Sequence, residues 1–305
     1  MRLFVYFVVL IFTMPMIQSC FTGIESTPKI TAKDLREQNV TVTAESRFAA
    51  SLAPEPLKDW SRGRRFMVAD AKLSMLFERE PQLRAGEILE YAGYENRPTI
   101  AGDTLSSLIF NRGDQSQIRY PINLSPVQIS GGSFASLPMA VDLALVDNVR
   151  NHIRGNSYYL LTPLRVDSTM TPIANGKKYV RVDIVNVVPG NGYYPLRVDI
   201  ADAEGHNASV AMTAGIDLSS TRNFDSVFSF SNPRLRYPDI SDSTWLLITN
   251  SEVTNGMTTE ECRLSLGSPC DVKKGQNGSS FFEQWTYDNG AYCIFTDGVL
   301  SSYRL

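Results

Sequence analysis

The sequence predicts an α+β fold that is mostly β, with one or two small β-barrel or sandwich modules followed by a C-terminal ααβββ module. Three observations predict this class. Short alternating apolar and polar runs recur between glycine-containing turns over residues 57–238. Asn289-Gly290 and Asp297-Gly298 separate the last runs of the chain, and such pairs are typical of tight antiparallel hairpins. Helical spacing is confined to a few short segments, which predicts a small number of helices packed on sheets.

The first twenty residues have the pattern of a bacterial lipoprotein signal. A positive N-terminus precedes an apolar run over residues 3–12, and Ser19 and Cys20 follow. A positive end, an apolar core and a small residue before the cut are what a secretory signal requires. Because Cys20 directly follows that cut, as in the lipobox, we expect removal of residues 1–19 and acylation of Cys20. A transmembrane anchor is the alternative, but the apolar run ends near Pro15, short of the ~20 residues that cross a bilayer.

Residues 20–56 are interpreted as a lipidated tether. This stretch is polar and shows no sustained periodicity except near Leu35. A flexible chain of ~30 residues has an r.m.s. span of about 30 Å, so it would hold an anchored module away from the bilayer. The alternative is that residues 32–39 form a short helix packed on the body of the protein.

Residues 57–135 predict a first β-rich domain, a small barrel or sandwich. Its runs are short and separated by glycines, a spacing typical of antiparallel strands. The expected strands are residues 65–68, 73–77, 87–91, 106–110 and 117–122.

Residues 136–238 predict an amphipathic helix followed by a second β-rich domain. Residues 137–153 carry apolar side chains at helical spacing, and Gly155 suits the C-terminal stop. Both β regions open with a glycine, two basic residues and an aromatic residue. This similarity indicates either a duplicated barrel of SH3 size or convergent turn chemistry. The apolar positions of the helix are Val141, Leu145, Val149 and Ile153, and the expected strands are residues 158–164, 178–188, 193–201, 208–212 and 226–230.

Residues 239–305 predict the ααβββ module, which begins with a helix over residues 243–251. A second helix is specified completely. Thr258 is an N-cap, and Glu261 three residues later completes a capping box. Gly267 takes the left-handed position at the C-terminus, and Pro269 prevents continuation. Met257, Cys262 and Leu266 share one face of this helix, with Leu264 beside it.

Three strands then supply the sheet of this module, at residues 281–287, 291–295 and 299–304. The turns at residues 288–290 and 296–298 contain Asn-Gly and Asp-Gly, which specify tight hairpins. Alternation along the first strand places one face inward against the two helices, and the residues of that face are Phe281, Glu283, Trp285 and Tyr287.

These residues resemble the SmpA/OmlA domain of bacterial outer-membrane lipoproteins, a BamE-like domain whose fold recurs in β-lactamase-inhibitory proteins. The resemblance covers residues 240–305, about a fifth of the chain. It implies the fold of the module, because the matched positions are caps, turns and core residues. Unlike the lipoproteins of that family, this chain carries a long β-rich region before the module. The matched positions are Gly256, Met257, Thr258, Glu261, Gly267, Pro269, Trp285 and Gly298.

Three cysteines remain besides Cys20, and an odd number cannot pair completely. A bridge between Cys262 and Cys270 would close a short loop, and a compartment outside the inner membrane permits disulfides. The alternative is that Cys262, Cys270 and Cys293 are small core residues or free thiols, since cysteine without a disulfide is commonly buried.

The sequence shows no recognisable catalytic motif. His152 and His206 are the two histidines, and neither has a spacing that relates it to a nucleophile. The nucleophile elbow, the zincin helix and the phosphate-binding loop do not occur. A glycosidase-like carboxylate pair is a property of the fold and is not readable from the sequence. We therefore predict a protein that is not an enzyme, with no cofactor and no metal.

Composition excludes nucleic acid as an expected partner. The chain has 29 Lys and Arg against 32 Asp and Glu, a net charge of −3. Removal of residues 1–19 takes away Arg2 and no acid, which leaves about −4. The densest basic cluster, residues 62–65, is too small to neutralise many phosphates.

Two functions remain as hypotheses. By resemblance, the first is a scaffold or accessory lipoprotein that binds envelope proteins at the outer membrane. The second is an inhibitor or a glycan- or peptide-binding lipoprotein that captures a hydrolase or ligand. Sugar binding needs aromatic rings exposed to solvent, and the candidates are Tyr91, Tyr94, Tyr193-Tyr194 and Phe281-Phe282.

The residues around Cys20 also indicate which of the two bacterial membranes would hold the lipid anchor. Phe21 follows Cys20, where inner-membrane lipoproteins of enteric bacteria carry aspartate, which favours the outer membrane. Residues 20–29 resemble the leaders of Bacteroidetes lipoproteins, but the acidic cluster of their surface-exported members is not present after Cys20. We therefore expect a lipid-anchored protein that faces the periplasm.

Overall fold

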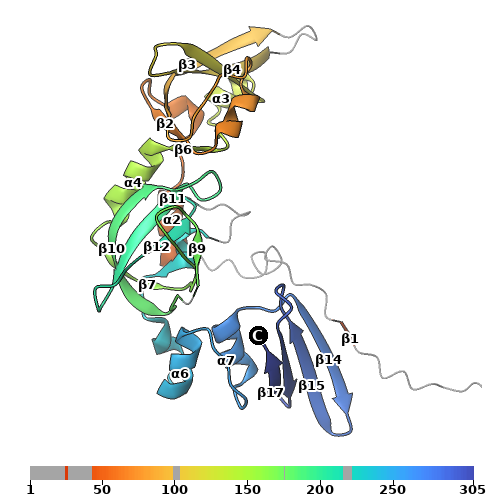
Figure 1. Cartoon of the computed structure of the whole chain (residues 1–305). Helices are drawn as coiled ribbons and strands as arrows, with labels where there is room; N and C mark the ends of the chain where they lie inside the picture. The colour runs from red at the N-terminus through yellow and green to blue at the C-terminus, as the bar shows by residue number, and fades with distance from the viewer. Residues whose placement is uncertain (1–24, 27–42, 99–103, 175, 216–221) are drawn as a thin grey trace, which may run out of the picture.

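The computed structural model describes residues 25–26, 43–98, 104–174, 176–215 and 222–305. The signal, Cys20 and residues 32–39 lie outside this range, so the predictions made for them stay predictions. The described residues form an α+β fold that is mostly β, as the sequence predicts. They build three antiparallel sheets, each with its own hydrophobic core (Figure 1).

The first domain is a five-stranded sheet in the order β5-β4-β3-β2-β6. Its core includes Phe66, Leu89 and Phe110, all at most 3% exposed. A bulge beside Gly93 bends β3. Gly93 has a backbone φ of +130°, which residues other than glycine rarely adopt. The strands are β2 (Arg65–Val68), β3 (Ile88–Pro98), β4 (Thr104–Asn111), β5 (Gln117–Ile122) and β6 (Ala140–Asp142), and the helix α3 (Pro126–Ser130) follows β5.

The predicted strand at residues 73–77 is wrong. These residues belong to the 3-10 helix η2 (Ala71–Leu76) and its C-cap. The side chain of Asp70 accepts a hydrogen bond from the backbone N–H of Lys72 at 2.9 Å, which starts a helical turn. Leu73 and Phe77 are buried four residues apart, whereas Met75 is 60% exposed, so their apolar pattern is helical.

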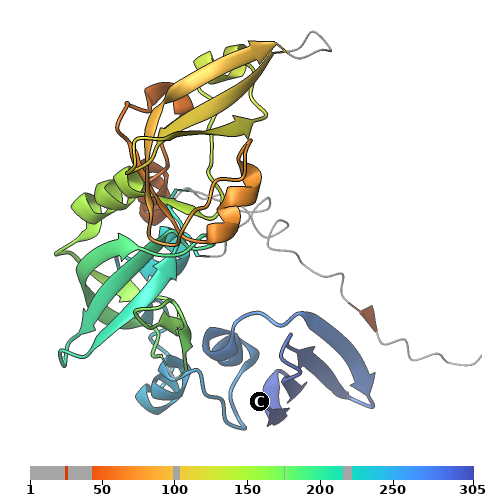
Figure 2. The same ribbon diagram turned by 45° about the horizontal axis from the view of Figure 1, so that its top comes forward.

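The second domain is a seven-stranded sheet in the order β13-β7-β10-β11-β12-β8-β9. The helix α4 lies between the first and second domains (Figure 1, Figure 2). Strands β8 and β9 have two residues each, too few to leave a readable alternation. The elements are α4 (Leu143–Ile153), β7 (Ser157–Leu160), β8 (Arg165–Val166), β9 (Pro172–Ile173), β10 (Val180–Pro189), β11 (Leu196–Asp202), β12 (Asn207–Met212), α5 (Phe224–Val227) and β13 (Phe228–Ser229).

Helix α4 begins six residues later than predicted. Asp142 is its N-cap, and its carboxylate accepts a hydrogen bond from the N–H of Ala144 at 3.0 Å. The residues before Asp142 extend and pair with β2 as β6. Val141 lies in strand β6 but is buried in the same core as the helix. It is therefore apolar, and in the sequence it looks like the first apolar position of the helix.

The interpretation of residues 43–56 as tether is wrong. Helix α2 (Ala44–Ser51), capped by Thr43, packs on the second domain. Ala49 and Leu52 are fully buried in the core of that domain. The carboxylate of Glu45 accepts hydrogen bonds from Ser229 Oγ at 3.0 Å and from the N–H of Phe230 at 3.1 Å.

The first domain is therefore inserted into the second. The chain contributes α2 to the second core and then builds the first core from Leu57, in the 3-10 helix η1 (Leu57–Asp59), to Leu137. It returns to the second core at Val141. Both connections between the domains run through the same boundary, which limits their relative motion more than one linker would.

The C-terminal module has one strand more than the predicted ααβββ arrangement. Strand β14 (Asp271–Asn277) precedes the three expected strands. Val272 is its one aliphatic residue, so the sequence carries no strand signal there. The module consists of α6 (Asp242–Thr249), α7 (Thr259–Leu266), β14, β15 (Ser280–Thr286), β16 (Tyr292–Thr296) and β17 (Val299–Arg304), and the 3-10 helix η3 (Pro233–Arg236) leads into it.

A fifth strand of this sheet comes from the N-terminal segment. Strand β1 (Glu25–Ser26) pairs antiparallel with β14, with Glu25 opposite Lys274 and Ser26 opposite Lys273. The sheet order is β1-β14-β15-β16-β17. Residues 25–26 thus belong to the edge of the C-terminal sheet (Figure 1).

The cap of α7 is confirmed at its N-terminus and differs at its C-terminus. Thr258 and Glu261 form the predicted capping box. Gly267 has φ +87° and ψ −171°, which is an extended conformation open to glycine alone rather than the predicted left-handed helical one. Within the helix, Cys262 and Ser265 are the buried positions, whereas Leu266 is half-buried beside them.

Candidate functional site

The second domain and the C-terminal module meet at a seam, which we define as Lys178, Tyr179, Arg234, Tyr237, Trp245 and Ser265. Lys178 is 5% exposed, and its backbone N–H donates to the carbonyl of Thr249 at 3.0 Å. Its Nζ donates to the carbonyl of Ser265 in the last turn of α7, and the hydroxyl of Tyr179 donates to the carbonyl of Leu264 at 3.3 Å. The last carbonyls of a helix have no partner within it. One module therefore supplies the C-terminal cap for a helix of the other.

Aromatic rings close the same seam. The ring centroid of Trp245 lies 5.4 Å from that of Tyr179 and 6.1 Å from that of Tyr237. The guanidinium of Arg234 lies 5.1 Å from the Trp245 centroid. Such ring pairs and cation–π contacts each contribute about 0.5–1.5 kcal/mol. These contacts hold the two modules in one orientation.

Burial governs the ionisation of the seam. It lowers the pKa of Lys178 to about 8, because the ammonium is buried against a backbone carbonyl rather than a carboxylate. Burial also raises the pKa of Tyr179, and Tyr237 adds to this rise. The lysine faces the negative end of the α7 dipole, which favours its charged form. Tyr179 has φ +59°, which is uncommon for a residue that is not glycine.

The boundary between the first and second domains is built differently. We call it the first junction and define it as Glu55, Arg64, Met139, Asp142 and Gly192. The side chain of Arg64 is 5% exposed and donates to both oxygens of Asp142, at 2.6 Å from Nη2 and 3.1 Å from Nε. It also pairs with Glu55. A Cβ added to Gly192 would lie 2.9 Å from Met139 Cα, so the β10–β11 loop needs glycine there to reach the first domain.

The ionisation of Arg64 follows from its two carboxylates. Burial opposes the charged guanidinium, but hydrogen bonds and charge attraction from Asp142 and Glu55 outweigh it and raise the pKa of Arg64. Arg64 and Lys178 both lie in the similar Gly-basic-basic-aromatic segments, Arg64 as the first basic residue and Lys178 as the second. The structure places each of them, buried, at a boundary between modules.

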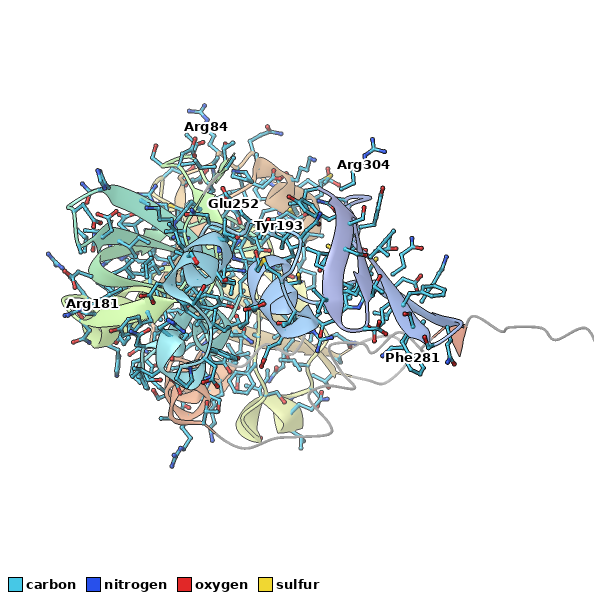
Figure 3. All side chains as sticks on the ribbon, turned by 90° about the horizontal axis from the view of Figure 1, so that it is seen from below. Arg84, Arg181, Tyr193, Glu252, Phe281 and Arg304 are labelled. Atoms are coloured by element: carbon cyan, nitrogen blue, oxygen red, sulfur yellow. The ribbon has the colours of Figure 1, made fainter. Side chains whose placement is uncertain are left out.

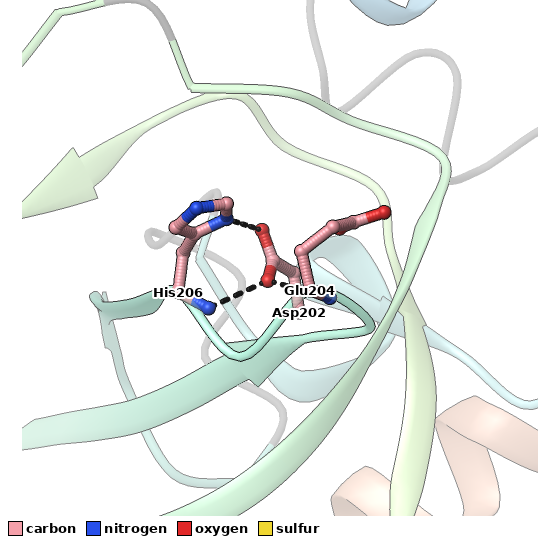
Figure 4. A group of neighbouring side chains, drawn as sticks. All are labelled: Asp202, Glu204 and His206. Atoms are coloured by element: carbon pink, nitrogen blue, oxygen red, sulfur yellow. Dashed lines mark hydrogen bonds and ion pairs between the residues drawn. The ribbon is translucent and has the colours of Figure 1, made fainter.

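The two histidines lie in separate elements. His152 hydrogen-bonds the carbonyl of Asn148 within α4, at 2.7 Å from Nδ1. His206 lies with Asp202 and Glu204 in the turn between β11 and β12 (Figure 4). Their ligand atoms lie within 4.8 Å of one another. Glu204 and His206 are exposed, and Asp202 is partly buried.

The carboxylate of Asp202 has a structural role in that turn. It accepts hydrogen bonds from the N–H of His206 at 2.7 Å, from its Nδ1 at 3.0 Å and from the N–H of Glu204 at 3.1 Å. Partial desolvation opposes its ionisation, but these donors outweigh it and lower the pKa of Asp202. Hydrogen bonds of this kind stabilise a hairpin turn.

One shallow hollow of about 390 Å³ lies on the second domain between β8, β9 and β12. Ile173 and Val185 line it and are each close to half exposed. The carboxylate of Asp199 also lines it, and it accepts hydrogen bonds from Ser209 Oγ at 2.7 Å and Arg197 Nε at 3.1 Å. The Asp199 carboxylate is therefore satisfied within the fold.

Among the candidates for sugar binding, the exposed aromatic rings belong to different modules. Tyr94 is 41% exposed on β3, Tyr193 is 88% exposed in the β10–β11 loop, and Phe281 is 61% exposed on β15. Tyr91 is buried in the first core, and the guanidinium of Arg222 lies 5.2 Å from the ring of Tyr194. A sugar platform needs neighbouring exposed rings, and these three rings stand on three separate sheets.

The residues that carry the family resemblance build the C-terminal module. Met257 and Trp285 are core residues at 3% and 1% exposure. Gly256 and Gly298 have φ values of +96° and +81° in turns, and the N–H of Gly256 donates to the carbonyl of Leu300 at 2.9 Å. Pro269 follows the Gly267 exit, as the sequence predicts. None of these residues belongs to the seam as defined.

The sequence analysis gave buried core thiols as one alternative for the cysteines, and this alternative is confirmed for Cys262 and Cys293. Both are buried thiols in the C-terminal core. Burial raises the pKa of Cys262 to about 12, and Cys293 adds to this rise, so the thiol is unreactive at neutral pH. The S–H of Cys270 donates to the carbonyl of Thr286 at 3.0 Å.

Searches of family models, curated proteins and solved structures gave no significant match to this chain. Within the described residues, no helix has the length and apolarity to cross a bilayer. The seam could not be found from the sequence, because Lys178 and Tyr179 stand in an ordinary polar segment. The one available signal was the similar Gly-basic-basic-aromatic opening of the two β regions.

Proposed function

We propose that this protein is a lipid-anchored scaffold of the outer membrane, which presents three modules in a fixed arrangement to other envelope proteins. The observation that carries the proposal is the path of the N-terminal segment. It pairs with the C-terminal sheet as β1, completes the second core as α2 and enters the first core at Leu57. A tether that only anchors a domain has no need to join all three modules.

Two features support a scaffold role. The first junction and the seam are both closed by buried cations and their partners, so the modules keep a defined spacing. The exposed apolar side chains, including Tyr193, Leu235 and Phe281, are spread over different modules. Separate exposed apolar residues on a rigid support suit contacts with more than one partner.

The experiment that tests the function is crosslinking in intact envelopes, followed by purification of the lipidated protein and mass spectrometry. The matched control is the Cys20→Ala variant, which lacks the acylation site and keeps every described residue. We expect outer-membrane proteins to be recovered with the parent and lost with the variant. Recovery of a single secreted or periplasmic hydrolase, or of polysaccharide alone, would replace the scaffold proposal with inhibition or glycan binding.

A further inference from the structure

The register of β1 gives the direction from which the N-terminal segment arrives. Glu25 pairs with Lys274 and Ser26 with Lys273, so β1 runs opposite to β14. The backbone therefore enters β1 from the side of Gly275. This is the side on which β14 continues into its hairpin with β15 (Figure 1).

The length of chain before β1 limits how far the anchor lies from that hairpin. Cys20 precedes Glu25 by five residues, which span at most about 18 Å when fully extended. From Lys274 the strand continues three residues to Asn277, a rise of about 10 Å. An acylated Cys20 thus keeps the tip of the β14–β15 hairpin close to the bilayer.

The hairpin tip, defined here as residues 278–281, carries an exposed aromatic ring. Phe281 is 61% exposed, although its backbone N–H is fixed by a 2.8 Å hydrogen bond to Asp297 Oδ1. Figure 3 shows Phe281 at the end of the sheet beside β1, far from Tyr193. The described fold thus leaves a large apolar side chain exposed at the end of a rigid hairpin, and such exposed apolar groups often mark a contact surface.

The surroundings of Phe281 match a lipid surface in charge and shape. Lys273 and Lys274 are exposed on the adjacent strand, and Lys274 Nζ pairs with Glu283 at 2.9 Å. A Cβ added to Gly275 would lie 2.2 Å from the ring of Phe282, so Phe282 lies across β14 and thickens the apolar end of the hairpin. Apolar rings with lysines behind them are typical of groups that enter the boundary between headgroups and acyl chains.

We propose that the tip of the β14–β15 hairpin inserts Phe281 into the membrane that holds the lipid anchor. The inference rests on the proposed function, because it requires acylation at Cys20. It adds a second point of contact, which fixes the orientation of the C-terminal module and, through the seam, that of the second domain. The partner of this surface is the lipid bilayer.

The test uses the full lipidated protein in vesicles of phosphatidylethanolamine and phosphatidylglycerol with brominated acyl chains. Two variants are compared, Phe281→Trp and Tyr193→Trp, and the emission of the parent with its native tryptophans is subtracted. Both introduced rings stand at exposed aromatic positions, so both variants keep the fold. We expect the brominated lipid to quench the tryptophan at position 281 by about half and to leave that at position 193 unchanged, because only groups within the membrane boundary reach the acyl chains.

Flotation of the same vesicles separates the two proposals. A protein that floats while both tryptophans are unquenched overturns the hairpin contact and leaves the anchor standing. A protein that carries no lipid and does not float overturns the anchor, and with it the hairpin contact. Quenching at position 281 that persists in vesicles of neutral lipid supports the apolar contact, whereas equal quenching at both positions would overturn the proposed orientation.

Discussion

The first junction and the seam both bury a cation, but they neutralise it in different ways. Arg64 faces two carboxylates, and its planar guanidinium donates twice to Asp142. Lys178 faces the carbonyl of Ser265 at the end of α7 and the ring of Tyr179, whose centroid lies 5.4 Å from Nζ, so its described partners are uncharged. Paired charges are costly to separate, whereas a charge that is compensated only by dipoles loses its proton more easily. The first and second domains therefore form one unit, whereas the C-terminal module is held by a weaker, pH-sensitive contact.

The largest effect is expected from breaking the first junction. Arg64→Met leaves the carboxylate of Asp142, 14% exposed, without its cation. We expect a loss of about 3 kcal/mol in the free energy of unfolding, since removal of one partner from a buried pair is strongly destabilising. Urea unfolding of the variant and the parent, both with Cys20→Ala, measures it. Arg65→Met, at the exposed neighbouring position, is the control, and an equal loss for both variants would contradict the role of Arg64.

A smaller effect is expected at the exit of α7, where the seam cap sits. Gly267→Val forces a β-branched residue to φ +87° and ψ −171°. No atom lies within 4 Å of the added Cβ, so the cost is backbone strain of about 1–3 kcal/mol. Ser268→Ala at the next position serves as the control. A melting curve equal to that of the parent would reject the assigned conformation of Gly267.

The seam itself is expected to depend on pH. The pKa of Lys178 is about 8 in the folded protein, below the 10.5 of an exposed lysine. Between these values the unfolded chain binds more protons, so this residue makes the folded state more stable as the pH rises. Buried acids act in the opposite direction, because the pKa values of Cys262 and Tyr91 are raised to about 12.

Comparison with Lys178→Met isolates the lysine from those acids. We expect the variant to match the parent at neutral pH within about 1 kcal/mol, since an apolar replacement removes both the buried charge and its hydrogen bond. The parent should then gain about 2 kcal/mol relative to the variant as the pH rises towards 10. Denaturant unfolding across this pH range measures the difference. A difference that stays constant with pH would show that Lys178 titrates as an exposed group.

The smallest effect is expected from the hydroxyl of Tyr179. Tyr179→Phe removes one hydrogen bond to Leu264, which has a length of 3.3 Å, and keeps the ring contact with Trp245. We expect a loss of about 0.5–1 kcal/mol in unfolding free energy. Tyr159→Phe, on the same sheet and outside the seam, gives the baseline. A loss in unfolding free energy larger than that of Gly267→Val would contradict this, because a single 3.3 Å hydrogen bond should contribute less.

The sequence predicted those parts of the fold that local chemistry determines. The capping box of Thr258 and Glu261, the two-residue hairpin at Asp297-Gly298 and the run of strand β5 follow from caps, turns and alternation. Strand β14 was missed because its pairing with β15 and β1, and not its own side chains, makes it a strand. Local pattern does not report such tertiary pairing.

The relation between distant segments was not readable from the sequence. Helix α2 is interpreted as tether from the sequence because its apolar residues are mostly small alanines, yet Ala49 and Leu52 fill a core made by residues from Val141 onward. The seam was missed for the same reason, since Lys178 meets Ser265 only in the folded chain. Discontinuous cores and boundaries between modules depend on contacts that are remote in sequence.

The proposed scaffold and membrane contact both depend on the pairing of β1 (Glu25–Ser26) with β14 at the edge of the C-terminal sheet. This pairing is tested by a Ser26→Cys, Lys273→Cys pair, whose positions face each other across β1 and β14, treated with a short thiol crosslinker in intact envelopes. Among the described cysteines, Cys270 is the one outside the buried core, and Cys270→Ser removes its thiol. Ser26→Cys with Lys72→Cys in the first domain is the control. We expect an intramolecular crosslink for the first pair alone. Crosslinks only between molecules, or equal crosslinking of both pairs, would contradict it.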